Sequence, residues 1–190
     1  MSKIKYKVQH PASMLARFGA FVIDWMVSGL ILGTINAIGY RILSGTDDLF
    51  TDYYSFLLAD VPVSSIAIPF CICMIAGIIY YVLIPYSVWS GQTPGKKFFN
   101  IKIINEGNKL SMLNLFIRNF VLFILIGCTS PVSTTLRQFI TVMIKIDVDE
   151  PWLVIGSVLC VISFGTAMWK FSGKTIHDRL THTKVISIKN

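Results

Sequence analysis

The stretch MLARFGAFVIDWMVSGLILGTINAIGY, residues 14–40, decides the fold of this chain. A helix needs about 20 mostly apolar residues to cross the hydrocarbon layer of a bilayer. This stretch is longer than that, and Arg17 and Asp24 are its only charged residues. It begins too late and runs too far for the apolar region of a cleavable signal peptide. We therefore predict an uncleaved first transmembrane helix.

Three more apolar stretches follow, at residues 63–89, 112–129 and 152–171. Hydrophobic residues make up 54% of the chain and charged residues 14%, whereas a typical soluble domain has roughly 25% charged residues. The sequence therefore predicts an all-α membrane protein, a four-transmembrane-helix bundle in a single domain over residues 1–190. Residues 139–146 are apolar but too few to span, and we expect them in a loop. Apolar residues at helical spacing over 49–57 predict a short amphipathic helix on the outer surface.

The basic residues indicate an orientation. Of the 17 Lys and Arg residues, 14 lie toward the N-terminus, around the loop after the second stretch, or after the fourth stretch. The positive-inside rule places these segments, and with them both termini, in the cytoplasm. Because the net charge of +7 is scattered between apolar stretches, we expect a lipid bilayer as the partner and no nucleic acid.

Two polar segments carry the alternation of a β-strand. Phe99, Ile101 and Ile103 alternate with polar residues over 97–105, and a similar pattern recurs over 183–188. Turn residues flank the first segment at Gly91–Gly95 and Glu106–Asn108. We predict a short, β-hairpin-like cytoplasmic cap formed by this loop and the tail.

The first stretch holds the main candidate site. Arg17 and Asp24 are seven residues apart, so on a helix they lie roughly 10 Å apart along the axis with nearly the same facing. A charged carboxylate near the bilayer centre costs on the order of 2.5–3.5 kcal/mol. Asp24 should therefore be paired, protonated or beside a cavity, with Arg118 as one candidate partner. Two interpretations remain open: a proton or cation site, or a carboxylate that holds helices together.

A second side of the same helix carries small residues. Gly29, Gly33 and Ala37 repeat every four residues, a spacing that favours close helix packing, within the chain or in a dimer.

Metal and enzyme chemistry are not expected. His10, His177 and His182 lack nearby Cys or Glu support, and the four cysteines, including Cys71 and Cys73, are poorly spaced for a metal clamp. No plausible Ser-His-Asp or Cys-His arrangement is found in the sequence. We expect no enzyme activity, no cofactor and no metal.

Three segments, in order, resemble the bacterial RDD family of membrane proteins, which is named for an arginine and two aspartates. They are ARFGAFVID at residues 16–24, GQTPGKK at 91–97 with the following strand and Arg118, and IHDRL at 176–180. The resemblance implies that Arg17, Asp24 and Asp178 are the name-giving residues. It also implies a bacterial inner membrane location and, for some members, sodium–proton exchange.

Two functions follow as hypotheses. The first is transport of ions or small solutes through a protonatable Asp24 at a helix interface. Because four spans make a thin pathway, this hypothesis includes a homo-oligomer. The alternative is a non-enzymatic regulator or immunity-type protein that binds another membrane protein. Its motivation is the small-residue ladder, the small size and the lack of an evident inverted repeat, which many transporters have.

Overall fold

The computed structural model describes residues 10–107, 109–126, 130–169 and 173–188. Cys128, the end of the third predicted span at 127–129 and the end of the fourth at 170–171 lie outside these residues. The elements are α1 (Met14–Ser44), α2 (Tyr53–Leu58), α3 (Val63–Ile78), the π-helical segment η1 (Ile79–Val88), α4 (Pro94–Phe98), β1 (Ile101–Asn105), α5 (Met112–Phe116), the π-helical segment η2 (Ile117–Val121), α6 (Leu122–Ile126), α7 (Pro131–Ile144), α8 (Asp149–Trp169), α9 (Ile176–Leu180) and β2 (Thr183–Ser187).

Helix α1 turns a polar stripe inward. Its buried residues recur every four positions and include Asp24, Ser28 and Asn36, while large apolar side chains such as Leu15 and Leu30 are exposed. Ser13 caps the first turn by accepting a hydrogen bond from Ala16 N, and Gly45 ends the helix in the left-handed conformation. Exposed apolar side chains around a polar interior suit a helix that faces lipid.

Among the described residues, three helices are long and apolar enough to cross a membrane: Met14–Ser44, Val63–Val88 and Asp149–Met168. They correspond to the first, second and fourth predicted spans. The span expected at 112–129 is not among them, because the described part of it is divided into α5, η2 and α6 and its apolar helix covers only Met112–Ile124. The four-span count is therefore not confirmed.

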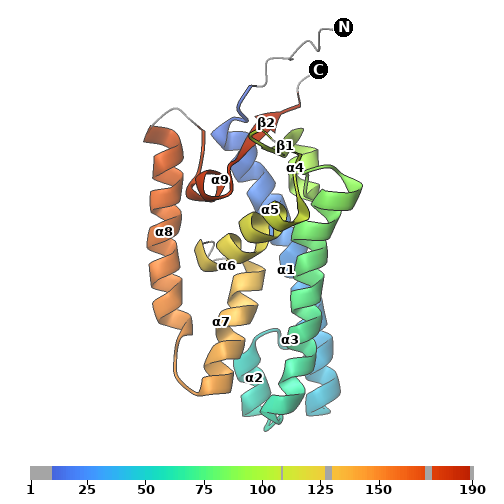
Figure 1. Cartoon of the computed structure of the whole chain (residues 1–190). Helices are drawn as coiled ribbons and strands as arrows, with labels where there is room; N and C mark the ends of the chain where they lie inside the picture. Colours follow the sequence, from blue (N-terminus) through green and yellow to red (C-terminus); the bar gives the residue numbers. More distant parts are fainter. Residues whose placement is uncertain (1–9, 108, 127–129, 170–172, 189–190) are drawn as a thin grey trace, which may run out of the picture.

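Helix α7 corrects the expectation of a loop at 139–146, which is wrong for residues 139–144. Ser130 caps this helix and Pro131 occupies its first turn, a favourable position for proline. Val132 and Val142 are buried, and α7 contacts α1 and α3. In Figure 1, α5 and α6 slant across the bundle and α7 continues toward the end that carries α2.

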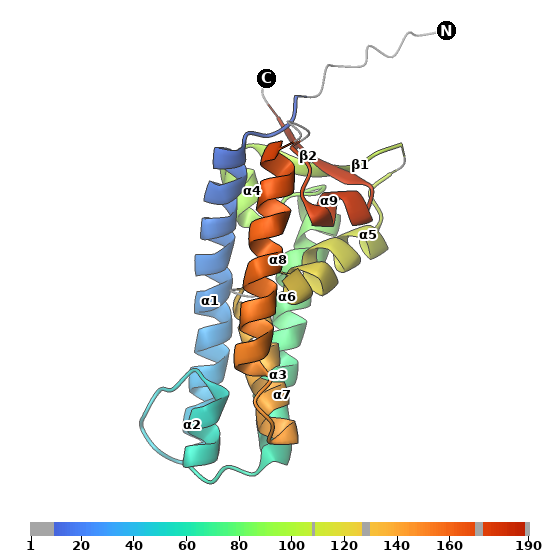
Figure 2. The same ribbon diagram turned by 90° about the vertical axis from the view of Figure 1, so that its left-hand side faces the viewer.

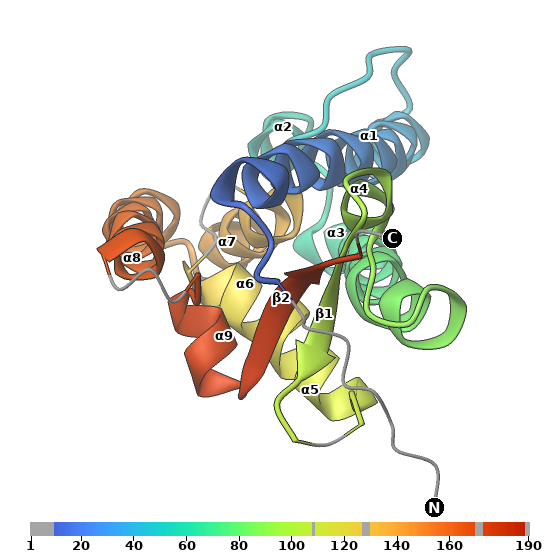
Figure 3. The same cartoon turned by 90° about the horizontal axis from the view of Figure 1, so that it is seen from above.

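The two predicted strands pair with each other. β1 and β2 are antiparallel, with Ile103 opposite Val185, and Pro11 forms a further bridge with Ile186. They belong to segments far apart in the chain, so they form a sheet but not a hairpin. Figures 2 and 3 show α4, α9 and both strands gathered at one end of the long helices, where the described ends of the chain also lie. We call this the sheet end, and the end that carries α2 the α2 end.

Apolar clusters fill the bundle between the two ends. The middle cluster includes Leu32, Cys73 and Val132. At the α2 end, Tyr53 and Phe56 are completely buried in a second cluster. The short helix predicted near residues 49–57 is thus present as α2, but it is packed into the fold by these two rings.

Candidate functional site

Asp24 is buried and surrounded by hydrogen-bond donors. Its Oδ1 accepts bonds from the Tyr80 hydroxyl at 2.9 Å and from Gly95 N at 2.8 Å. Its Oδ2 accepts a bond from the Thr93 hydroxyl, and the Lys96 ammonium lies 3.7 Å from the same oxygen. Both oxygens are therefore held, and the charge of the carboxylate has a cation beside it.

The segment GQTPGKK brings three of these groups to Asp24. Thr93 is the N-cap of α4 and Pro94 occupies its first turn, so the chain turns sharply against α1. At Gly95, a side chain would overlap the Ala20 carbonyl oxygen and crowd the Asp24 carboxylate. Only glycine allows the backbone N–H of this residue to approach Asp24 so closely.

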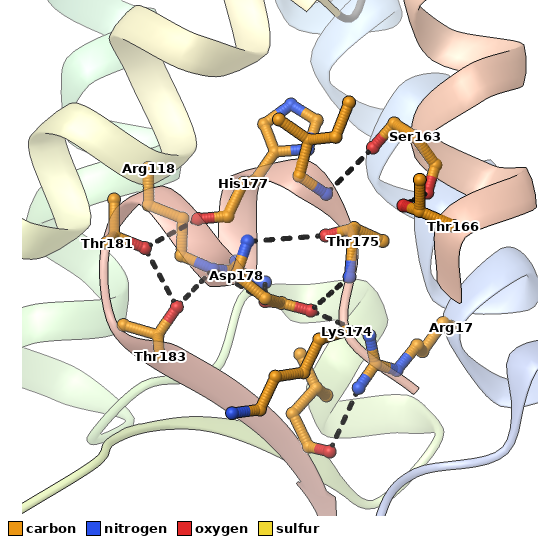
Figure 4. A network of polar contacts seen from close by, with 12 residues as sticks. Arg17, Arg118, Ser163, Thr166, Lys174, Thr175, His177, Asp178, Thr181 and Thr183 are labelled. Carbon is orange, nitrogen blue, oxygen red and sulfur yellow. Dashed lines mark hydrogen bonds and ion pairs between the residues drawn. The ribbon is translucent and has the colours of Figure 1, made fainter. Parts of the chain in front are cut away.

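Asp178 forms a second ionic centre beside the first. Arg17 NH1 lies 2.9 Å from its Oδ2, and Arg118 NH2 lies 2.5 Å from its Oδ1. Figure 4 shows the two guanidinium groups reaching this carboxylate from different elements. Asp178 also caps α9 through a reciprocal pair of hydrogen bonds with Thr175. The tail is thereby fixed to α1 and η2 by one buried acid.

The burial of these groups shifts their pKa values. Burial raises the pKa of Asp178, but Arg118 and Arg17 more than reverse that effect and hold it at about 2. Burial and the neighbouring Arg118 lower the pKa of His177 to about 4, so its imidazole is neutral at pH 7. Burial also lowers the pKa of Lys96, against the opposing attraction of Asp24. Lys96 is therefore easier to deprotonate than an exposed lysine.

A cavity of about 190 Å³ lies beside both centres. Polar side chains on its wall come from α1, α4, η2 and the segment at α9, and apolar side chains complete it. Its lining includes Arg17, Asp24, Lys96, Arg118, Asn119 and His177, with Phe21, Ile101, Phe123 and Val185 among the apolar residues.

The four predicted site residues lie together, but their pairing differs from the expectation. Arg118, the candidate partner of Asp24, instead binds Asp178, and Arg17 does the same. The charged neighbour of Asp24 is Lys96. Sequence reasoning missed Lys96, Thr93 and Tyr80, although GQTPGKK was one of the segments that carried the family resemblance.

The small-residue ladder has an ordinary environment. A side-chain carbon at Gly29 would lie 3.5 Å from Pro131 and one at Gly33 would lie 3.7 Å from Thr51, while Ala37 is half-buried. The tight approach of α1 to α3 occurs instead at Gly39, where such a carbon would lie 2.8 Å from Pro69. Within the described residues, no three His, Cys, Asp or Glu side chains gather as a metal site.

One comparison with known proteins gave a match. The model of the RDD family matches residues 11–182, a range that contains Arg17, Asp24, Lys96, Arg118 and Asp178. No curated protein and no solved structure matches the chain.

Proposed function

Because the chain belongs to the RDD family, we propose that it is a membrane transporter of ions or small solutes in which the Asp24–Lys96 pair exchanges protons. The observation that carries this proposal is the half-buried Lys96 ammonium, which lies 3.7 Å from the buried Asp24 carboxylate at the wall of a cavity. A carboxylate buried within a membrane-spanning helix is costly, and such groups typically mark ion pathways.

The opposite charges of Asp24 and Lys96 allow a proton to be exchanged for another cation. When the Lys96 ammonium releases its proton to the cavity, Asp24 loses the cation beside it. A small cation such as Na⁺ can then bind the carboxylate, with the Thr93 hydroxyl oxygen close by. One cation is taken up for each proton released, which is the sodium–proton exchange that the family resemblance implies. The lowered pKa of Lys96 favours the release.

Transport through this site requires movement elsewhere. Beyond the cavity, the middle cluster and the aromatic cluster at the α2 end fill the bundle with apolar side chains. A pathway would have to open between α1, α3 and α7, or form at the contact with a second copy of the chain. We therefore include a homo-oligomer in the proposal.

The filled far half is also the observation that favours a second function. A regulator or immunity-type protein that binds another membrane protein needs no pathway, and its polar centre would serve only to hold the tail on the bundle. Neither function involves enzyme chemistry.

For both functions, we propose that the protein lies in a bacterial inner membrane with both termini in the cytoplasm. The N-terminal segment, the basic loop and the tail meet at the sheet end, which supports placing them on one side of the membrane.

The decisive experiment measures sodium-driven proton flux in proteoliposomes that contain only this protein. We expect flux from the wild type, its loss in Asp24→Asn and Lys96→Gln, and no change in Lys97→Gln. Lys97 is the matched control because it is the exposed neighbour of Lys96 and lies over the Trp89 ring. Equal flux in Asp24→Asn would overturn the proposal. No wild-type flux together with a stoichiometric partner in mild detergent would favour the regulator.

The orientation has its own test. A reporter placed at Asp52 or Glu150 should be accessible from outside the cell, and one placed at Glu106 should not. A cytoplasmic result for either of the first two positions would reverse the proposed topology.

A further inference from the structure

Two consecutive tyrosines of η1 reach the proposed exchange site at Asp24 together. The Tyr80 hydroxyl donates to Asp24 Oδ1 at 2.9 Å, and the Tyr81 hydroxyl lies 2.9 Å from Ser28 Oγ, one turn further along α1. The two rings pack edge to face with their centroids 4.8 Å apart, so the position of one ring constrains the other. The backbone of η1 at this point therefore decides whether Asp24 keeps its tyrosine donor.

Asn119 holds that backbone from the neighbouring segment η2. Its Nδ2 donates to the Tyr81 carbonyl oxygen at 3.0 Å. In an α-helix this carbonyl would accept from the N–H four residues later, but Pro85 occupies that position and has no N–H. The Asn119 amide thus supplies a donor to a carbonyl whose α-helical donor is missing. π-helical turns such as η1 are frequent at functional sites.

The other side of the same amide contacts the ionic centre at Asp178, which we call the tail centre. Arg118 NH1 donates to Asn119 Oδ1 at 2.8 Å, while NH2 of the same guanidinium is bound to Asp178. A guanidinium only donates and a backbone carbonyl only accepts, so the amide meets both partners in one orientation alone. Asn119 is buried, and leaving either of its groups unpaired would be costly. A continuous chain of contacts therefore runs from Asp178 through this amide and η1 to Asp24.

We propose that Asn119 is a positioning residue of the exchange site. It fixes η1 against η2 so that Tyr80 keeps its bond to the Asp24 carboxylate, and it thereby couples the tail centre to that carboxylate. A movement of the tail that shifts Arg118 would reach the exchange site as a weaker Tyr80 bond. The inference rests on the proposed transport for the statement that Asp24 exchanges ions, whereas the coupling itself requires no transport.

The first test follows Tyr80 by NMR in the full-length protein in detergent, with tyrosine labelled with ¹³C at the carbon that bears the hydroxyl. The loss of one signal in Tyr80→Phe assigns it. A phenol that donates to a carboxylate resonates downfield of one that does not, so Asn119→Leu should move the Tyr80 signal upfield. Asn114→Leu, the same change at a half-buried position of α5, should leave the signal in place.

A second variant covers the case in which Asn119→Leu fails to fold. Asn119→Asp keeps the shape of the side chain and the acceptor for Arg118, but it replaces the donor by an oxygen that faces the Tyr81 carbonyl. This variant should also move the Tyr80 signal upfield. An unmoved signal in a folded Asn119 variant would overturn the positioning role.

The second test measures the sodium concentration that half-saturates proton flux in proteoliposomes. Tyr80→Phe should raise it about tenfold, the worth of one hydrogen bond to a charged group, because the cation must then order the carboxylate itself. Asn119→Leu should raise it as much, with the maximal rate little changed, and the double variant should raise it no further. Effects that multiply in the double variant would overturn the coupling. A shifted Tyr80 signal without wild-type flux would overturn the proposed transport and leave the positioning role standing.

Discussion

The two ends of the bundle each bury an arginine–aspartate centre, yet the two centres are built differently. At the sheet end, Asp178 lies between Arg17 and Arg118 with its side chain fully buried. At the α2 end, Arg137 faces Asp149 alone, 2.6 Å from Oδ1, and the carboxylate is 19% exposed. The Tyr54 hydroxyl donates a further bond to Asp149 at 3.0 Å.

The difference lies in charge balance and surroundings. Arg137 and Asp149 form a balanced pair that joins α7 to α8, next to the aromatic cluster of Tyr53, Phe70 and Phe139. Within the described residues, Arg137 Nε makes no hydrogen bond, but one cation is paired with one carboxylate there. The sheet end instead has a surplus positive charge beside a cavity. A balanced pair suits a clamp between helices, whereas a centre with a surplus charge is costlier to keep buried.

The sharpest test of this difference replaces the acid at each end. Asp178→Asn leaves two buried guanidinium groups without a counter-charge, and we expect a loss of about 3–5 kcal/mol in the free energy of unfolding. Asp149→Asn leaves only Arg137 without a counter-charge, at a position where the acid is 19% exposed. This variant should therefore lose less of the free energy of unfolding. Reversible unfolding in mixed micelles measures both. Equal losses would show that the two centres do not differ in the way their burial suggests.

Acid should weaken the sheet end. The pKa of Asp178 is about 2 when folded against 3.8 as the ordinary value, so the folded state binds this proton less readily than the unfolded state. The stabilisation is therefore complete above about pH 4 and is lost as the pH falls toward 2. At 1.36 kcal/mol per pKa unit, it amounts to about 2 kcal/mol. Unfolding measured over this range should show the loss in the wild type, and a smaller one in Asp178→Asn.

Two glycines, one at the site and one where α1 faces Pro131, give a matched comparison of packing. Gly95→Ala would push a methyl group against the Ala20 carbonyl oxygen and the Asp24 carboxylate, and we expect a cost of about 1–3 kcal/mol, as for other overpacked sites. Gly29→Ala meets only ordinary contact with Pro131 and improves helix propensity, so it should be neutral or slightly stabilising. A large loss from Gly29→Ala would restore the small-residue ladder as a tight packing surface.

The sequence predicts those parts of the fold that depend on local pattern. Residues 14–40 and 63–89 are apolar over enough length to identify two spans, and the alternation near Ile103 and Val185 identifies two strands. Helix α7 was missed for a physical reason. Its Thr135 and Arg137 are polar but buried, so the apolar stretch that the sequence shows, residues 139–146, covers only part of the helix and is too short to suggest a span.

The candidate site was predictable in location but not in pairing. The spacing of Arg17 and Asp24 places both on one face of α1, as the structure has them. Which acid each base binds depends on where the loop and the tail fold back, and no periodicity within a helix contains that information. Lys96 and Asp178 reach the site from segments far along the chain, in α4 and α9, the short helices that precede the two paired strands.

The smallest predicted effect separates the two ends at a single hydroxyl. Tyr54→Phe removes the hydrogen bond to Asp149, which should cost about 1 kcal/mol because the carboxylate keeps its pairing with Arg137. The same variant should leave proton flux unchanged, since Tyr54 lies at the α2 end. Unfolding in micelles and the flux assay in proteoliposomes measure these outcomes. A loss of flux in Tyr54→Phe with little loss of stability would mean that the α2-end clamp takes part in opening the pathway and is not merely structural.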